Sequence, residues 1–248
     1  MNTGLYLENL KVNLGDKVLI DNLNLHVPNG EIHVIMGKNG TGKSTLSKAL
    51  SGHSDYQITG GKALLNGENI VGEAVEDISR KGLFLAFQHP VEVEGVTIAN
   101  FIRACINARL PEGIDINVPE FYKELREKMA QLDMPSTMSA RNLNEGFSGG
   151  EKKRCDILQM LMLKPNFVIL DEPDSGLDVD ALKIVSQGIN SYKSKDVGFL
   201  VITHYHRLLE YIKPDVVHIL DGGKIVKSGT AQLAKDLEEL GYDGVVKA

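Results

Sequence analysis

The chain has 248 residues, 42% of them hydrophobic and 24% charged, which is typical of a globular protein with one large domain or one domain and a subdomain. Its formal net charge of -6 argues against broad binding to a nucleic-acid backbone. No apolar run approaches the ~18 residues of a membrane span, no signal peptide is apparent, and the cysteines, Cys105 and Cys155, form no C-x-x-C pair. We therefore expect a cytoplasmic protein that does not insert into a membrane.

The first third of the chain is predicted to be rich in strands. Apolar runs, separated by Gly, Asn and Asp turns, indicate strands at Leu5–Val12, Leu23–Val27, Glu31–Met36, Lys62–Asn66 and Leu83–Gln88.

The middle of the chain changes to a helical pattern. Apolar residues at helical spacing predict helices at Thr97–Ala108, Glu120–Leu132 and Ser148–Leu163. After Pro165 an alternation of strands and helices returns, with the predicted elements Phe167–Leu170, Val179–Tyr192, Gly198–Thr203, Val216–Leu220 and Lys224–Ser228. The pattern therefore predicts an α/β nucleotide-binding core that is interrupted by a helical insertion at roughly residues 89–164.

A phosphate-binding loop lies between a predicted strand and the predicted helix Ser44–Ser51. The sequence there matches G-x-x-x-x-G-K-[ST], and its residues are Gly37, Lys38, Asn39, Gly40, Thr41, Gly42, Lys43, Ser44 and Thr45. The glycines allow a tight turn in which consecutive N–H groups point at phosphate oxygens. Lys43 is expected to reach the β- and γ-phosphates, and the Ser44 hydroxyl to ligate Mg²⁺. This motif predicts a nucleoside triphosphate as the ligand.

Two carboxylates follow the apolar strand that begins at Phe167. A P-loop enzyme needs an acidic group at the end of a neighbouring strand to hold Mg²⁺, and Asp171 fits that position. Glu172 is the candidate that orients or deprotonates the attacking water. Together with the P-loop, these residues predict hydrolysis of a nucleoside triphosphate.

The segment Phe147–Glu151 opens the third predicted helix and has two interpretations. Its Ser-Gly-Gly turn offers free N–H groups and a hydroxyl that suit a second phosphate contact. Ser148 followed three residues later by Glu151 is also a capping box, and the two interpretations are compatible.

The chain resembles the ATP-binding-cassette (ABC) ATPases through six motifs in order. They are Gly37–Thr45 (Walker A), Gln88 (Q-loop), Phe147–Glu151 (signature), Phe167–Glu172 (Walker B), Ser175–Asp178 (D-loop) and His204 (switch histidine). The resemblance implies an α/β P-loop NTPase core with an antiparallel β subdomain and an inserted helical subdomain. It implies one ABC ATPase domain over residues 1–248, with the core at 1–88 and 165–248 and the helical subdomain at 89–164.

The same resemblance implies roles for these residues. Glu172, His204 and Gln88 would be catalytic, and Ser44, Gln88 and Asp171 would hold Mg²⁺ beside ATP. Two chains would form an ATP-dependent head-to-tail dimer. Each ATP would then lie between one subunit's Walker A and the signature of the other, formed by Ser148, Gly149, Gly150 and Glu151.

A narrower resemblance is to the SufC-type ATPases of iron–sulfur cluster assembly. The similar segments are Leu85–Val96, Phe147–Arg154, Asp156–Met160, Asp174–Asp178, Thr203–Tyr205 and Tyr211–Asp215. Transporter cassettes usually have Leu-Ser-Gly-Gly-Gln and Thr-Ser-x-Leu-Asp, whereas this chain has Phe147, Glu151 and Asp174, as SufC-type proteins do. The resemblance implies SufB- and SufD-type scaffold partners, which bind through the Q-loop and the following helix, roughly Gln88–Leu110.

Two other functions remain open at this point. The chain could be the nucleotide-binding subunit of a membrane ABC transporter, in which case the same surface would receive a coupling helix. A DNA-repair or ribosome-associated ABC protein is disfavoured, because no coiled coil, zinc module or second cassette is visible.

Two further expectations concern the nucleotide site. Most cassettes stack an aromatic residue on adenine, but the corresponding position here is about Leu14, and no aromatic residue lies between Tyr6 and the P-loop. We therefore expect weaker recognition of the base. We also expect Lys152 or Lys153 to pair with a nearby carboxylate such as Glu172 in the resting monomer.

Overall fold

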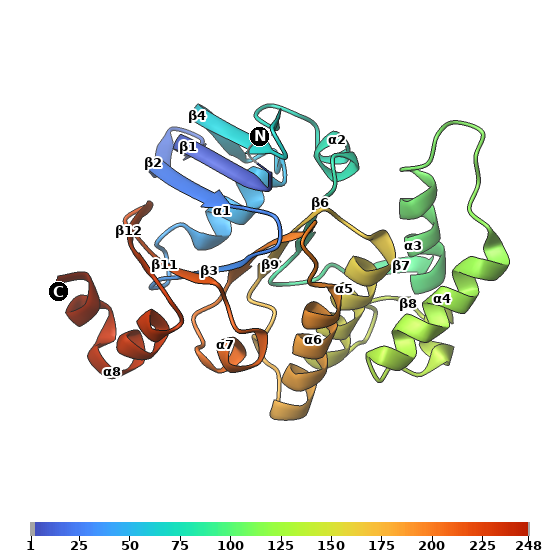
Figure 1. The fold of residues 1–248 in the computed structure, drawn as a ribbon. Helices are drawn as coiled ribbons and strands as arrows, with labels where there is room; N and C mark the ends of the chain where they lie inside the picture. Colours follow the sequence, from blue (N-terminus) through green and yellow to red (C-terminus); the bar gives the residue numbers. More distant parts are fainter. Residues whose placement is uncertain (1–2, 248) are drawn as a thin grey trace. The chain divides into compact units, whose positions relative to one another are not determined.

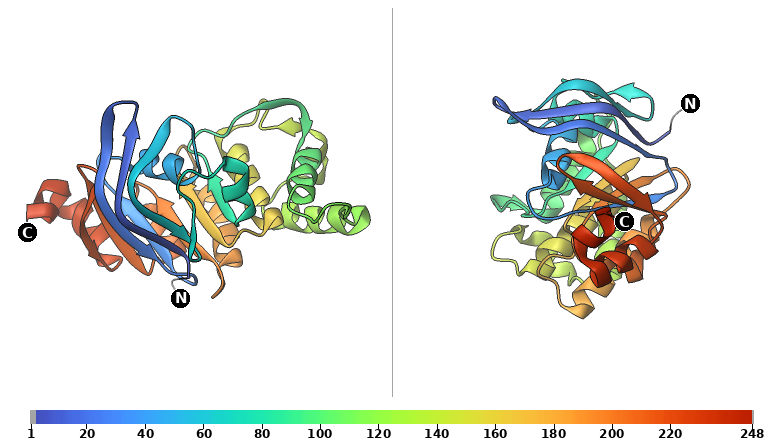
Figure 2. Two further views of the ribbon diagram at one scale, coloured as in Figure 1. Left: turned by 90° about the horizontal axis from the view of Figure 1, so that it is seen from above. Right: turned by 90° about the vertical axis from the view of Figure 1, so that its left-hand side faces the viewer.

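The computed structural model describes residues 3–247, so residues 1–2 and 248 of the expected domain range lie outside it. The described chain forms two compact units (Figures 1 and 2). Unit 1 comprises the residues up to Phe87, Pro165–Pro173 and the residues from Lys193 onward, and unit 2 comprises Gln88–Lys164 and Asp174–Tyr192.

Unit 1 contains two sheets of different kinds (Figure 1). The first is antiparallel, in the order β2-β1-β4-β5, and the second, in the order β12-β11-β3-β10-β9-β6, is parallel except at its β12 edge. The first sheet consists of β1 (Leu5–Leu14), β2 (Lys17–Val27), β4 (Tyr56–Leu65) and β5 (Glu68–Asn69). The second consists of β3 (Ile32–Met36), β6 (Leu83–Ala86), β9 (Phe167–Asp171), β10 (Gly198–Ile202), β11 (Val216–Asp221) and β12 (Lys224–Gly229).

The helix α1 (Lys43–Leu50) packs between the two sheets of unit 1 (Figure 1). Leu46 and Leu50, four residues apart on one helical face, are fully buried in a core that contains residues of both sheets. Every residue of β9 and β10 is buried as well. This burial explains why both strands read as continuous apolar runs in the sequence, as central strands of parallel sheets do.

Three helices of unit 1 were not predicted from the sequence. They are α2 (Val75–Arg80), α7 (Arg207–Ile212) and α8 (Gln232–Lys247). The first two have only 6 residues each, which is too short for a helical period to stand out. The third is interrupted at Gly241, whose backbone is not helical.

Unit 2 is mainly helical. Its elements are β7 (Val93–Thr97), α3 (Ile98–Asn107), α4 (Val118–Gln131), the 3₁₀ helix η1 (Ser136–Ala140), β8 (Asn142–Leu143), α5 (Gly149–Leu163) and α6 (Val179–Tyr192). The four α-helices were predicted to within two residues at each end. Side chains of Thr97 and Asn117 cap α3 and α4. Helices α5 and α6 pack closely, since a β-carbon at Gly188 would lie 2.5 Å from Ile157.

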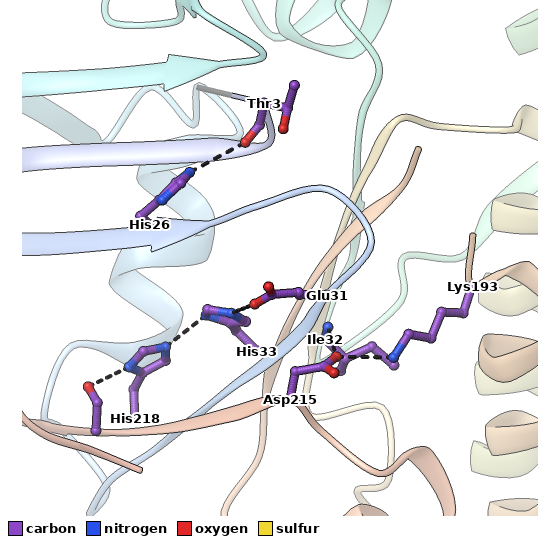
Figure 3. A network of polar contacts seen from close by, with 9 residues as sticks. Thr3, His26, Glu31, Ile32, His33, Lys193, Asp215 and His218 are labelled. Carbon is purple, nitrogen blue, oxygen red and sulfur yellow. Dashed lines mark hydrogen bonds and ion pairs between the residues drawn. The ribbon is translucent and has the colours of Figure 1, made fainter. Parts of the chain in front are cut away.

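A chain of polar groups with two buried histidines at its centre runs from Glu31 through β3 and β11 to β12 in unit 1 (Figure 3). The Nε2 atom of His33 lies 2.7 Å from Glu31, its Nδ1 lies 2.9 Å from His218 Nε2, and His218 Nδ1 lies 2.7 Å from the Ser228 hydroxyl. One set of tautomers satisfies all three contacts with both imidazoles neutral: Ser228 donates to His218, His218 to His33, and His33 to Glu31. Burial above all, and secondly the electrostatic influence of His33 when His218 becomes charged, lower the pKa of His218 to about 4.

This network predicts a loss of stability in acid. Because the unfolded chain protonates His218 near its usual pKa of 6.5 and the folded chain only near 4, the unfolded state binds more protons between these values. The stabilisation is present above pH 6.5 and falls by up to about 3 kcal/mol as the pH drops toward 4. Urea unfolding of wild type and His218→Gln at several pH values measures this difference.

Comparing His218→Gln with wild type separates the effect of this histidine on stability from that of the carboxylates, which also titrate in acid. His218→Gln should show a shallower fall in its free energy of unfolding than wild type, and exposed His89→Gln should match wild type. Equal slopes for wild type and His218→Gln between pH 6.5 and 4 would contradict the prediction.

Candidate nucleotide-binding site

The P-loop connects β3 to α1 in unit 1, as predicted. Gly40 and Gly42 have φ angles of 82° and 108°, which glycine adopts without strain. A β-carbon at Gly37 would lie 2.4 Å from the carbonyl oxygen of Leu220. The three glycines therefore allow the loop to turn tightly and to approach the neighbouring backbone closely.

The Lys43 side chain folds back across this loop. Its Nζ donates hydrogen bonds to the carbonyl oxygens of Gly37 at 2.7 Å and Lys38 at 3.0 Å. Burial lowers the pKa of Lys43, while the negative charges of Glu172 and Asp171 act in the opposite direction. The ammonium is thus held inside the loop, within electrostatic reach of both carboxylates.

Asp171, the last residue of β9, faces two hydroxyls of α1. Its carboxylate accepts a hydrogen bond from Ser47 at 2.8 Å and a longer one from Ser44 at 3.4 Å. Ser47 was not singled out in the sequence, although its spacing of three residues from Ser44 places both on one helical face. The geometry brings Ser44 and Asp171 together, as the motif spacing predicted.

Glu172 and His204 approach one another at the ends of adjacent strands. Glu172 has a φ of 48°, which is strained for a residue other than glycine, and its N–H donates to the Ile202 carbonyl at 2.8 Å. Its Oε1 lies 3.3 Å from His204 Nδ1, close enough for an ion pair but outside hydrogen-bond geometry. His204 also packs against the ring of Tyr205, with centroids 3.9 Å apart. A strained, buried carboxylate beside a histidine is an arrangement often found at functional sites.

The remaining predicted site segments belong to unit 2. Ser148 caps α5 in a reciprocal capping box, in which its hydroxyl accepts from the Glu151 N–H at 3.3 Å and its own N–H donates to the Glu151 carboxylate at 2.8 Å. The hydrogen bonds that the Ser148 N–H and hydroxyl donate to the carboxylate lower the pKa of Glu151. The capping interpretation is confirmed, and it leaves the glycines after Ser148 at the start of the helix. The Asp178 carboxylate accepts from the Ala181 N–H at 2.8 Å at the start of α6.

The two lysines after the signature have contacts within unit 2. Lys152 forms an ion pair with the carboxylate of Glu92 at 2.7 Å, and a pairing of Lys152 with Glu172 stays a prediction. Lys153 donates to the backbone carbonyl of Gln88 at 3.0 Å. This bond ties the helix after the signature to the Q-loop residue. A pairing of Lys153 with Glu172 stays a prediction.

The oxygen groups at Ser44 and Asp171 suit a magnesium ion. Mg²⁺ prefers hard oxygen ligands and takes few of them from the protein, because it keeps waters and substrate phosphates. A hydroxyl and a carboxylate 3.4 Å apart fit this pattern. Within residues 3–247, no three His, Cys, Asp or Glu side chains gather into a metal site that the protein alone would supply.

These features define a P-loop nucleoside triphosphatase. A strand leads into a glycine-rich loop that carries a lysine, and a helix follows the loop. A parallel strand that ends in two carboxylates completes the site. The family model described as "ABC transporter" matches residues 20–175, and the chain belongs to this family. It is 51% identical to Vegetative protein 296 of Bacillus subtilis, over 97% of this chain and 92% of that protein. It is 48% identical to the probable ATP-dependent transporter ycf16 of Cyanophora paradoxa, over 96% of this chain and 93% of that protein.

Solved structures confirm the predicted fold. A nucleotide-free ATP-binding cassette from an ABC transporter has a TM-score of 0.78 and 21% identity, over 98% of each chain. The dimeric bacterial cassette MJ0796 has a TM-score of 0.79 and 18% identity, over 92% of this chain and 98% of that one. Family membership and fold together identify the chain as an ABC ATPase that binds ATP and hydrolyses it. No helix among residues 3–247 has both the length and the apolar character needed to cross a bilayer.

Proposed function

We propose that this chain is the ATPase subunit of an iron–sulfur cluster assembly scaffold, where ATP binding and hydrolysis drive a conformational change in SufB- and SufD-type partners. In this role the chain holds no cluster itself. It acts through its nucleotide cycle and through the surface that contacts the partners.

The observation that carries this proposal is the set of residues that depart from the usual transporter motifs. Phe147 is buried, with the Arg141 guanidinium 4.5 Å from its ring centre. Glu151 closes the capping box of α5, and Asp174 is buried as well. Phe147 and Asp174 are thus buried, and Glu151 is held in a helix cap. This placement supports the interpretation that the departures are specific features of a SufC-type cassette.

The nucleotide site suggests how the chain's own residues act on ATP. Glu172 is the proposed base that orients and deprotonates the attacking water. His204, whose ring lies beside it, is the proposed contact to the γ-phosphate, and Gln88 is the proposed sensor of the metal ion and the water. The proton taken from water would pass to the Glu172 carboxylate as the water oxygen bonds to the γ-phosphorus, while the bond from that phosphorus to the bridging oxygen breaks and ADP leaves with the electron pair.

Phosphate binding is assigned to the P-loop. Backbone N–H groups of Gly37–Thr45 would surround the β- and γ-phosphates, and Lys43 would exchange its two carbonyl partners for phosphate oxygens. Ser44, Gln88 and Asp171 would hold Mg²⁺, whose charge would neutralise phosphate oxygens during the reaction. The Asp171–Ser44 approach supports this assignment.

Activity is proposed to require two chains. The related cassette MJ0796 is described as dimeric, and a second structure of it as a dimeric post-hydrolysis state bound to ADP and Pi, with 19% identity to this chain. In a head-to-tail dimer, Ser148–Glu151 of one chain would complete the phosphate site of the other.

The isolated chain is expected to be a poor ATPase that its scaffold partner stimulates. The formal net charge of -6 opposes association of two free subunits, and a scaffold that binds both would overcome this repulsion. Steady-state ATPase should therefore rise when a SufB- and SufD-type complex is added. Val91, 69% exposed beside the Q-loop, lies in the proposed docking surface, so Val91→Glu should lose most of this stimulation.

The matched control is Ile114→Glu, which places the same charge on an exposed residue of unit 2 outside the proposed docking surface. It should keep both the basal rate and the stimulation. Full activity of a dilute, demonstrably monomeric chain would refute the two-chain site. Equal stimulation of Val91→Glu and wild type would refute the docking surface.

A second candidate function is the nucleotide-binding subunit of a membrane transporter. The name of one relative favours it, since the chain is 52% identical to a probable ABC transporter ATP-binding protein of Streptococcus pyogenes serotype M3, over 98% of this chain and 95% of that protein. Mass spectrometry of co-purifying proteins separates the two. Scaffold-type partners support the assembly function, and a membrane permease supports the transporter function.

A further inference from the structure

The short loop between β8 and α5 contains a buried asparagine, Asn144, three residues before the signature begins at Phe147. Asn144 is 2% exposed and has a φ of 61°, the left-handed conformation that asparagine adopts more readily than most residues. Its carbonyl accepts a hydrogen bond from the Phe147 N–H at 3.3 Å, which closes a turn that ends at the signature. Such a backbone conformation persists only where the surrounding structure holds it.

The side chain of Asn144 binds the segment that follows the Q-loop residue. Its Nδ2 donates a hydrogen bond to the carbonyl oxygen of Val91 at 2.9 Å. The Val91 side chain is 69% exposed and belongs to the docking surface proposed above. Val91 thus presents its side chain to the solvent while its backbone is bonded to the turn before the signature.

Backbone hydrogen bonds extend this connection toward α3 (Figure 1). The strands β7 and β8 pair in antiparallel fashion, with Val93 opposite Leu143. Where α3 begins, the Ile98 N–H donates to the Arg141 carbonyl at 3.0 Å. The residues just before the signature are therefore held along much of the segment that follows the Q-loop.

Two lysines in the first turns of α5 hold the other side of the signature. Lys152 pairs with Glu92 at 2.7 Å, and Lys153 donates to the Gln88 carbonyl at 3.0 Å. The signature is thus tied to residues 88–98 both before and after its own sequence. Asn144 is the buried side chain in this set that acts before the signature, and none of the six ABC motifs includes it.

We propose that Asn144 is a positioning residue for ATP hydrolysis. By holding the Val91 carbonyl, it fixes the turn from which the signature starts, so that the signature has one defined geometry when it meets the nucleotide of a second chain. Donors that are oriented in advance stabilise phosphate charge without a cost of reorganisation during the reaction. Asn144 acts through the signature and not on ATP itself. The inference rests on the proposed two-chain site, in which Ser148–Glu151 of one chain complete the phosphate site of the other.

The test compares the rate of hydrolysis with nucleotide affinity in the full chain. Asn144→Gly allows the left-handed backbone and removes the bond to Val91. ATP hydrolysis per chain, at saturating ATP and a fixed chain concentration, should fall about 3- to 10-fold, the usual effect of one neutral hydrogen bond. Affinity for ADP, measured by isothermal titration calorimetry, should equal that of wild type, because the P-loop belongs to unit 1 and Asn144 to unit 2.

A second variant, Asn144→Asp, keeps the size of the side chain and its tolerance of the left-handed conformation. It replaces the donating N–H by an oxygen, so it should also lose activity while it keeps its affinity for ADP. The matched control is Asp133→Gly, at an exposed residue of the same unit with a φ of 51°. The control should equal wild type in both measurements.

Several results would overturn the proposal. They are a wild-type rate in both Asn144 variants, an equal loss of rate in Asp133→Gly, and a loss of ADP affinity that parallels the loss of rate. Thermal unfolding of each variant completes the test. Asn144 variants that are unfolded at the assay temperature would show a role in the fold alone and would also count against the proposal.

The dependence of the wild-type rate on chain concentration separates this proposal from the two-chain site. A rate per chain that is the same at every concentration would refute the two-chain site, and the role of Asn144 with it. A rate per chain that rises with concentration, together with a wild-type rate in the Asn144 variants, would refute only the role of Asn144.

Discussion

Replacing Glu172 with glutamine should reduce ATP hydrolysis by about 100- to 10,000-fold, the usual contribution of a positioned acid–base group. The amide has nearly the same shape as the carboxylate and can adopt the same backbone conformation, so the buried site should keep its structure. Only the charge that accepts a proton from water is lost. Single-turnover measurement of phosphate release reports the rate, and nucleotide titration should show that ATP still binds.

The control for this substitution is Glu210→Gln, which makes the same chemical change at an exposed residue of α7 in the same unit. It should hydrolyse ATP at the wild-type rate. If Glu172→Gln turns over within a few-fold of wild type, Glu172 is not the base, and His204 or another group must activate the water.

Replacing Lys43 with alanine should weaken nucleotide binding and hydrolysis together. A hydrogen bond from a charged donor contributes about 1.5–3 kcal/mol, which corresponds to a loss of about 10- to 150-fold in affinity. The effect should be larger for ATP than for ADP, because the ammonium is expected to contact the γ-phosphate as well. Calorimetric titration with each nucleotide measures both values.

Lys48→Ala is the matched control, since it removes a lysine from the other end of the same helix. The Lys48 ammonium lies over the Tyr56 ring, 5.1 Å from its centre, and has no proposed contact with phosphate. Its affinity for ATP should equal that of wild type. Unchanged ATP affinity in Lys43→Ala would contradict the phosphate-binding assignment of the loop.

Several elements were shorter in the sequence interpretation than in the structure. The strand at Leu23–Val27 begins at Lys17 in β2, and the strand at Lys62–Asn66 begins at Tyr56 in β4. The added residues are mostly exposed or partly exposed, so they carry no apolar run that marks a strand. They extend because backbone hydrogen bonds to β1 continue along the antiparallel pairs.

The polar networks could not be predicted for a related reason. His33 and His218 are 185 residues apart in the chain, yet their ring nitrogens lie 2.9 Å apart because β3 and β11 pair in one sheet. Contacts of this kind follow from topology, and no local spacing signals them.

The sequence by itself determined the ligand class, the fold class and the order of the motifs, because each rests on local chemistry. A tight loop needs glycines at Gly40 and Gly42, and a hydrolytic site needs carboxylates such as Asp171 and Glu172 beside it. Only the tertiary structure decided which distant groups meet, as Ser47 does with Asp171 and Lys152 with Glu92. Such pairs form where packed strands and helices place two side chains within reach, which is a property of the folded chain as a whole.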